Sequence, residues 1–253
     1  MTGFLLLSVA SAGVCVVAML VTAYAAHRAG RVSLVDVTWG LALAAIAFVC
    51  AALGDGPAWR RWLLVALVGT WGLRLSWHVW RRGTGHGEDP RYTELLGSGR
   101  GGPLVRIWIP QGAAIWLVSL PLQVAAVAGP GLDAVVAVGV AIWLLGALFE
   151  AVGDAQLAAY RRRADRPPVL DTGLWRYTRH PNYFGDACVW WGVWLVSASA
   201  WPGALTVVSP AAMTYFLVFV TGARPLEETM RQRPGYLAYA ARTSMFVPLP
   251  PRR

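Results

Sequence analysis

The sequence predicts an all-α integral membrane protein with about seven transmembrane helices. Of its 253 residues, 57% are hydrophobic and 14% are charged, and the mean hydropathy is +0.50. Ordinary soluble domains carry about 25% charged residues. The apolar residues gather in long runs, and the basic residues gather between alternate runs. These observations exclude a soluble globular domain and indicate a bundle of helices in a bilayer.

Seven apolar runs approach the length of about 20 residues that a helix needs to cross the hydrocarbon core. They lie near residues 4–26, 34–53, 61–80, 107–128, 133–153, 185–201 and 203–222. The first run lacks the cleavage pattern of a secretory signal peptide, so we expect a retained helix. Only Trp201-Pro202-Gly203 separates the last two runs, which predicts a tight hairpin. The polar loops are short, so residues 1–253 are expected to form a single membrane domain.

The charged residues predict the orientation of the chain in the membrane. The sequence has no lysine, so all 22 residues counted as Lys or Arg are arginines. With seven spans, the side of the membrane opposite the C-terminus holds only Arg60 and Arg61. The positive-inside rule therefore places the N-terminus outside and the C-terminus in the cytoplasm. The net charge of +9 belongs to the cytoplasmic face, where membrane lipid headgroups and an anionic cofactor are better partners than nucleic acid.

The cysteines and histidines predict no metal site and no disulfide framework. Cys15, Cys50 and Cys188 all lie in apolar runs without paired spacing. The four histidines show no ligand spacing either. Isolated cysteines in such surroundings are typical packing residues.

A dense polar segment precedes the sixth apolar run. It contains Arg176, Arg179, Asn182 and Asp186 around Pro181. Pro181 fits the first position of a helix, where the following amides point outward and favour an anion. The two arginines suit phosphates, and Asn182 and Asp186 share one helix face. The alternative is a positively charged anchor that flanks a membrane helix.

Ionisable residues inside the expected spans are candidates for function because they are costly in a bilayer. Asp36 opens the second run, and Glu150 and Asp154 share a face near the end of the fifth. Two structural alternatives stay open. Arg74 in the third run could neutralise Asp36, and Arg161 could pair with Asp154.

Several of these segments together resemble a known superfamily. Arg179–Asp186 reads Arg-His-Pro-Asn-Tyr-Phe-Gly-Asp and resembles the Arg-His-x-Asn-Tyr-x-Gly-Asp signature of sterol reductases. The Glu150-x-x-x-Asp154 pair and the tail from Arg224 to Tyr239 resemble the C-terminal half of steroid 5-alpha-reductases. The segments that resemble a bacterial branch of that superfamily, a domain of unknown function, are Asp36–Gly40, Gly87–Tyr92 and Arg233–Tyr236.

The resemblance implies a reductase of the bacterial inner membrane whose site faces the cytosol. Residues 1–130 would be the substrate-side helices, and residues 131–253 would form the half that binds NADPH. The implied reaction is hydride transfer to the β-carbon of an activated C=C bond in a lipophilic enone. The substrate class stays open between steroids and other lipids.

The resemblance also implies site residues. In steroid reductases an acid on the second helix and a tyrosine on the third polarise the substrate carbonyl. Asp36 matches the acid, but Trp71 stands at the tyrosine position, and an indole donates a hydrogen bond without being a proton acid. The residues implied for the cofactor are arginines for phosphates, polar residues for adenine, ribose and carboxamide, and tyrosines for stacking. They are Glu150, Asp154, Arg161, Arg176, Tyr177, Arg179, His180, Asn182, Tyr183, Asp186, Arg224, Glu228 and Tyr236.

A different enzyme class shares part of this pattern. Isoprenylcysteine and phospholipid methyltransferases of membranes also carry Arg-His-Pro-x-Tyr-x-Gly, a downstream Glu-Glu pair and a Tyr-x-x-Tyr tail. Glu227-Glu228 and the Tyr236/Tyr239 pair match that pattern. The alternative cofactor would be S-adenosylmethionine, and a third possibility is a non-catalytic role in lipid binding or assembly.

Overall fold

The computed structural model describes residues 2–85, 87–97 and 102–252, and within these ranges the chain is helical without a β-strand. Five helical stretches are long and apolar enough to cross a membrane. They are Thr2–Ala29, Val32–Leu53, Leu104–Ala125, Asp133–Arg162 and Gly203–Met230. This result supports a membrane protein with an all-helical fold.

The other two expected spans are helical but are not among these five. α3 (Ala58–Gly83) covers the third apolar run and carries arginines at both ends and in its middle. α8 (Pro181–Ala198) covers most of the sixth run. It begins at Pro181, which confirms the expected first helical position. The count of seven spans and the orientation of the termini stay predictions.

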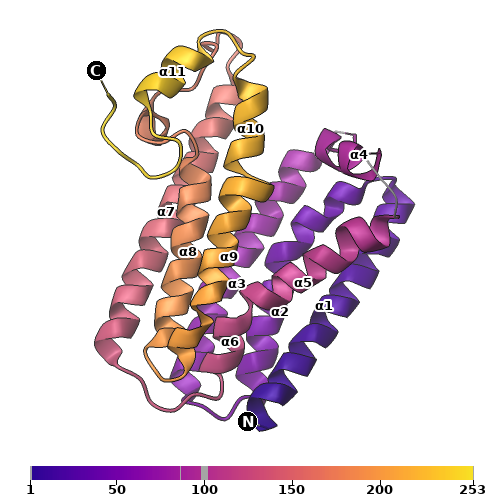
Figure 1. Cartoon of the computed structure of the whole chain (residues 1–253), viewed down its shortest axis with the longest axis vertical. Coiled ribbons are helices and arrows are strands. Elements are labelled where there is room, and N and C mark those ends of the chain that lie inside the picture. Colours follow the sequence, from indigo (N-terminus) through magenta and orange to yellow (C-terminus); the bar gives the residue numbers. More distant parts are fainter. Residues whose placement is uncertain (1, 86, 98–101, 253) are drawn as a thin grey trace. The chain divides into compact units, whose positions relative to one another are not determined.

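The chain divides into two compact units, and each is described by itself. The first unit comprises Met1–Val136 and Val196–Ser209. Its helices, drawn in Figure 1 in indigo to magenta with one orange segment, follow in chain order. They are α1 (Thr2–Ala29), η1 (Val32–Leu34), α2 (Val35–Leu53), α3, α4 (Pro90–Gly97), η2 (Leu104–Trp108), α5 (Ile109–Val118), α6 (Leu120–Ala125) and η4 (Gly203–Val207).

The core of the first unit is the packing of α2 against α3, which α1 joins on the side of α2. Gly40 and Gly72 face each other, and a Cβ on either would collide with the backbone of the other. Near this contact the Ser76 hydroxyl donates to the Val37 carbonyl at 2.7 Å. Small residues let helix backbones approach closely where the surrounding lipid provides no hydrophobic driving force.

The fourth apolar run, 107–128, is broken into shorter helices. α5 ends at Val118 and α6 begins at Leu120, with Pro121 at its second residue. Proline lacks an amide hydrogen and cannot continue a regular helix ladder. Past the end of α6, the fully buried Arg60 donates to the carbonyls of Ala125 at 3.1 Å and Gly129 at 2.8 Å. A cation at a helix C-terminus is favoured by the helix dipole.

The second unit comprises Ala137–Leu195 and Pro210–Arg253. Its main helices α7 and α8 cross closely at Gly146 and Gly185, where a Cβ would meet the backbone of the facing helix. In Figure 1, α11 and the C-terminal segment lie beyond the end of α7 and α8. The elements of this unit are α7 (Asp133–Arg162), η3 (Gly173–Arg176), α8, α9 (Val208–Tyr215), η5 (Phe216–Val220), α10 (Ala223–Met230) and α11 (Tyr236–Arg242).

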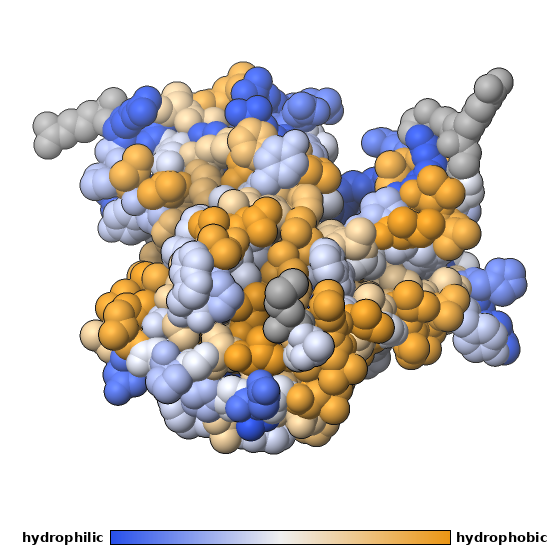
Figure 2. Space-filling view, turned by 60° about the horizontal axis from the view of Figure 1, so that its bottom comes forward, coloured by the Kyte–Doolittle hydropathy of each residue, from blue (hydrophilic) through white to orange (hydrophobic). Residues whose placement is uncertain are grey.

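Large apolar side chains are exposed on several helices. On α1, for example, Val9 is 71% exposed and Leu20 is 65% exposed. Figure 2 shows apolar side chains gathered over much of one face. Contiguous apolar surface on this scale is typical of helices that contact lipid.

The Gly40–Gly72 contact predicts the outcome of a matched pair of substitutions on α3. Gly72→Ala should lower the thermal unfolding midpoint in detergent by about 2–10 °C, because overpacking costs about 1–3 kcal/mol. Gly69→Ala should not lower it, since a Cβ at Gly69 meets nothing within 4 Å. Tryptophan fluorescence follows the unfolding of both variants. Equal midpoints would contradict the close approach of α2 and α3.

Candidate functional site

Glu227 is the centre of a buried polar cluster in the second unit. Its Oε1 atom accepts hydrogen bonds from Arg179 Nε at 2.8 Å and Tyr236 Oη at 2.7 Å. His180 Nε2 lies 3.0 Å from the same oxygen. The side chains of Arg179 and Glu227 are only 11% and 8% exposed. The cluster therefore joins the start of α8, α10 and α11 through one carboxylate.

Arg179 is committed further to the backbone of the C-terminal segment. Its Nη1 donates to the carbonyls of Ala240 at 2.8 Å and Thr243 at 2.6 Å. Arg179, His180 and Tyr236, which the sequence assigned to the cofactor, thus lie together around Glu227. The sequence assigned Glu228 instead of Glu227, but Glu228 is exposed.

The C-terminal segment straps the loop that leads into α8. Thr178 and Ser244 form an isolated parallel β-bridge, and the Thr178 hydroxyl donates to the Phe246 carbonyl at 2.8 Å. Further along, the Leu249 amide donates to the Tyr177 carbonyl at 3.0 Å. The Tyr177 side chain itself is 43% exposed. The residues just before α8 are therefore held in place by a segment that lies about 65 residues further along the chain.

A second group of polar residues lies where α7 faces α8. Asn182 Nδ2 donates to Asp154 Oδ1 at 3.2 Å. Glu150, Asp154 and Asp186 are 2%, 7% and 6% exposed. Tyr183 stacks on the His180 ring with their centroids 5.5 Å apart. Buried carboxylates on facing apolar helices are costly, and this cost makes them candidates for a functional role.

The remaining cofactor candidates are on the surface of the second unit. Arg161, Arg176 and Arg224 are exposed. Arg224 lies over the Phe219 ring at 4.4 Å, whereas Arg176 lines an open cleft of about 610 Å³. The cleft is polar and contains two further arginines, Arg242 and Arg252.

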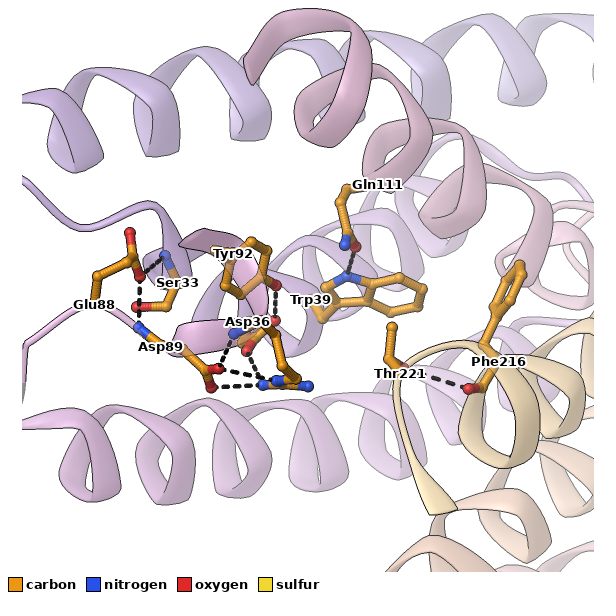
Figure 3. A network of polar contacts seen from close by, with 10 residues as sticks. Ser33, Asp36, Trp39, Glu88, Asp89, Tyr92, Gln111, Phe216 and Thr221 are labelled. Atoms are coloured by element: carbon orange, nitrogen blue, oxygen red, sulfur yellow. Dashed lines mark hydrogen bonds and ion pairs between the residues drawn. The ribbon is translucent and has the colours of Figure 1, made fainter. Parts of the chain in front are cut away.

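The first unit has its own polar site at the start of α2 (Figure 3). Tyr92 Oη donates to Asp36 Oδ1 at 2.5 Å, and Arg91 Nη2 lies 3.3 Å from Asp36 Oδ2. Tyr92 is 6% exposed. Its burial and the adjacent Asp36 carboxylate raise the pKa of the Tyr92 phenol, so it remains a neutral donor at physiological pH.

Local sequence explains why α4 delivers Tyr92 to this place. Asp89 precedes Pro90, the first residue of α4, and Asp89 Oδ1 accepts the Arg91 amide at 3.0 Å. An Asp at the N-cap followed by proline is a favourable helix start. Arg91 Nη2 also bonds to Asp89 Oδ2 at 2.9 Å, which orients the guanidinium toward Asp36.

Glu88 fastens this segment to η1. Its carboxylate accepts the amides of Ser33, at 3.0 Å, and of Val32. Burial alone would raise the pKa of Glu88, but the hydrogen bonds from Ser33, Val32 and Asp89 lower it overall. The ionised carboxylate therefore contributes stability that is present at neutral pH and lost as the pH falls through its folded-state pKa.

Trp71, which the sequence proposed as the partner of Asp36, is buried in α3 and 1% exposed. The hydroxyl on Asp36 comes instead from Tyr92 on α4. The sequence signal for Tyr92 was the Gly87–Tyr92 segment, which resembles the bacterial branch but gave no role to its tyrosine. Trp39, one turn after Asp36, donates its indole hydrogen to Gln111 Oε1 at 2.5 Å (Figure 3).

An apolar groove lies in the same unit between α1 and the η2–α5 segment. Its volume is about 450 Å³, and its walls include Cys15, Met19, Trp108, Gly112 and Trp116. Its apolar walls suit an apolar chemical group.

The Glu227 cluster predicts different effects for two adjacent glutamates. Glu227→Gln should lower the thermal midpoint by about 6–12 °C, because it leaves the buried Arg179 charge without a carboxylate, which costs about 3 kcal/mol. Glu228→Gln removes the same charge from an exposed position and should leave the midpoint unchanged. Scanning fluorimetry in detergent measures both, and a stable Glu227→Gln protein would refute the structural role.

The Glu88 contact predicts local loosening of η1 and α4. Glu88→Gln should speed hydrogen exchange of the Val32 and Ser33 amides about tenfold at neutral pH, because a charged acceptor is lost. Wild-type protein should lose the same protection only when the pH falls below the ordinary titration range of a glutamate, because the pKa of Glu88 is lowered. Glu94→Gln, an exposed change on α4, is the control and should exchange like wild type.

Comparison with known protein families gives a match over most of the chain. A family model described as "Protein of unknown function (DUF1295)" matches residues 15–243. None of the curated proteins and none of the solved structures matches this chain. The matched range contains Asp36, Tyr92, Arg179 and Glu227, around which the polar sites are built. The chain therefore belongs to the DUF1295 family.

Proposed function

We propose that this protein is an NADPH-dependent membrane reductase, similar to steroid 5-alpha-reductases, that reduces an activated C=C bond of a lipophilic enone. The observation that carries the proposal is the hydrogen-bonded pair of Asp36 and Tyr92 with Arg91 beside it. A carboxylate, a phenol and a guanidinium at the end of a membrane helix suit the polarisation of a carbonyl group. The resemblance of the motif segments to the reductase superfamily supports the same reaction.

The proposed role of this site is to stabilise negative charge on an oxygen of the substrate. A substrate carbonyl oxygen that displaces the Asp36 carboxylate as acceptor receives the hydrogen bond of Tyr92. As a hydride adds to the β-carbon, negative charge develops on that oxygen, and the neutral phenol and the Arg91 cation stabilise it until a proton from solvent adds to the α-carbon. Asp36 holds both donors in position before substrate binds. Tyr92 thereby takes the task that the superfamily gives to a tyrosine on another helix.

The donor set of the second unit fits NADPH. Asp154, Asn182 and Asp186 offer a carboxylate, an amide and a carboxylate near the start of α8, which suit ribose hydroxyls and a carboxamide. The exposed Arg161, Arg176 and Arg224 suit phosphates. When bound, NADPH supplies the hydride. Arg179 has a different task, because Glu227 and two carbonyls already accept its hydrogen bonds.

The substrate is proposed to be lipophilic because the first unit offers it an apolar groove. Substituents such as a steroid nucleus or a polyprenyl chain suit the groove between α1 and α5. The proposed location is the bacterial inner membrane, with the cofactor site on the cytosolic side, where the arginine-rich segments are expected.

The hydrogen bonds of the second unit weaken the argument for a methyltransferase. The residues that both families share are Arg179, His180, Glu227 and Tyr236, and here they bond to one another. A cluster of this kind holds helices together whichever cofactor binds. The residues that discriminate are the arginines and Asn182, and they favour a cofactor with phosphates over S-adenosylmethionine.

Substitutions at the Asp36–Tyr92 pair test the proposal. Tyr92→Phe should leave the stabilisation of the protein by NADPH intact but lower the rate of NADPH oxidation with a lipophilic enone about 100-fold or more, as for loss of an oxyanion donor. Asp36→Asn should behave similarly. Tyr24→Phe, which removes an exposed hydroxyl of α1, is the control and should keep full turnover.

The binding measurement decides between the enzyme classes. Stabilisation of wild type by S-adenosylmethionine and not by NADPH would replace the reductase with the methyltransferase. Full turnover in Tyr92→Phe would remove the carbonyl-polarising role from this pair.

A further inference from the structure

The cleft of the second unit concentrates positive charge. Three guanidiniums line it, from Arg176 at the end of η3, Arg242 at the end of α11 and Arg252 in the C-terminal segment. Thr172, Gly173 and Thr243 belong to the same wall. Among the described residues of this lining, Asp171 is the one carboxylate, and Arg242 Nη2 bonds to it at 2.5 Å. The excess of positive charge marks the cleft as a place for an anion.

Two of the three arginines keep their guanidiniums available. Arg242 is paired with Asp171, whereas no hydrogen bond of the Arg176 or Arg252 side chain is found within the described ranges. Like charges that converge on one cleft repel each other unless an anion binds between them. Guanidinium pairs bind phosphate oxygens with good geometry and strength.

The walls of the cleft are fixed by the backbone. The Leu174 amide donates to Gln156 Oε1 at 3.0 Å, and the adjacent Gly173 has a φ of 62°, which favours glycine. On the other side, the Arg252 amide donates to the Arg242 carbonyl at 2.8 Å. These contacts hold segments far apart in the sequence on either side of one cleft. A site whose framework is formed in advance loses less affinity to the ordering of its parts.

We propose that this cleft binds a phosphate group through Arg176, Arg242 and Arg252. Two sources carry this chemistry on the side of the membrane where arginines are expected. One is a free nucleotide phosphate, in which case the site rests on the proposed function and belongs to NADPH. The other is the headgroup of an anionic membrane lipid, which does not depend on the proposed reaction.

The test compares two double variants with the same loss of charge. Arg176→Gln with Arg252→Gln alters the cleft and leaves the Arg242–Asp171 contact in place. Arg231→Gln with Arg233→Gln alters exposed arginines outside the cleft and is the control. Full-length protein in detergent is titrated with NADPH and NADH, and with phosphatidic acid against phosphatidylcholine in mixed micelles. The readout is the ligand-dependent shift of the unfolding midpoint, which reports apparent affinity.

The cleft variant should bind the phosphate-bearing probe about tenfold or more weakly than the control, as expected for two exposed charge contacts. If the loss is confined to NADPH, with NADH unaffected, the source is the 2′-phosphate that only NADPH carries; if both nucleotides bind more weakly, it is the diphosphate that they share. If it is confined to phosphatidic acid, the source is the lipid headgroup. Equal binding of every probe by the two double variants would overturn the proposal.

The outcomes also separate the cleft from the proposed function. If NADPH stabilises both double variants to the same extent and no lipid effect is seen, the phosphate site in the cleft is refuted and the proposed reductase function is not. If phosphatidic acid alone stabilises the wild type and this effect is lost in the cleft variant, the phosphate site is supported and NADPH is refuted as the cofactor.

Discussion

The constraint on which this structure depends is that polar groups set among apolar helices must find partners inside the protein. Lipid offers no hydrogen bonds, so a charge drawn into a helix bundle is tolerated only when it is paired. Several buried polar groups find partners within their own unit. Glu227 gathers three side chains in the second unit, and Asp36 gathers Tyr92 and Arg91 in the first. Among the described residues, Arg60 has no acid as its partner; its Nη2 atom donates to backbone carbonyls at the end of α6 and just after it.

Sequence reasoning predicts features that depend on the residues of one helix. It does not predict contacts with residues that are distant in the sequence. The all-helical membrane class followed from composition, and the start of α8 followed from Pro181 because proline fits the first helical position. The sequence assigned Glu228 to the cofactor, whereas the structure buries its neighbour Glu227, because adjacent residues of a helix point about 100° apart and only tertiary packing decides which one is buried. Tyr92 was missed because it reaches Asp36 from a short helix 56 residues away. Spacing along the chain contains no signal for such a contact.

The two units carry different parts of the proposed chemistry. The first holds a carboxylate, a phenol and an apolar groove, which suit a lipophilic carbonyl compound. The second holds buried carboxylates, Asn182 and exposed arginines, which suit a nucleotide. A substrate site changes with the substrate, whereas a cofactor site is held to one ligand.

The Glu227 cluster has an evolutionary consequence. Arg179, His180, Glu227 and Tyr236 come from three separate elements and share one carboxylate oxygen, so a change in one leaves buried polar groups unpaired in the others. Natural selection for a folded chain alone is then enough to keep the four together. A descendant with a different function would still retain them, so their presence reflects inherited architecture. Changes of activity within such a lineage would come from substitutions of residues outside the cluster.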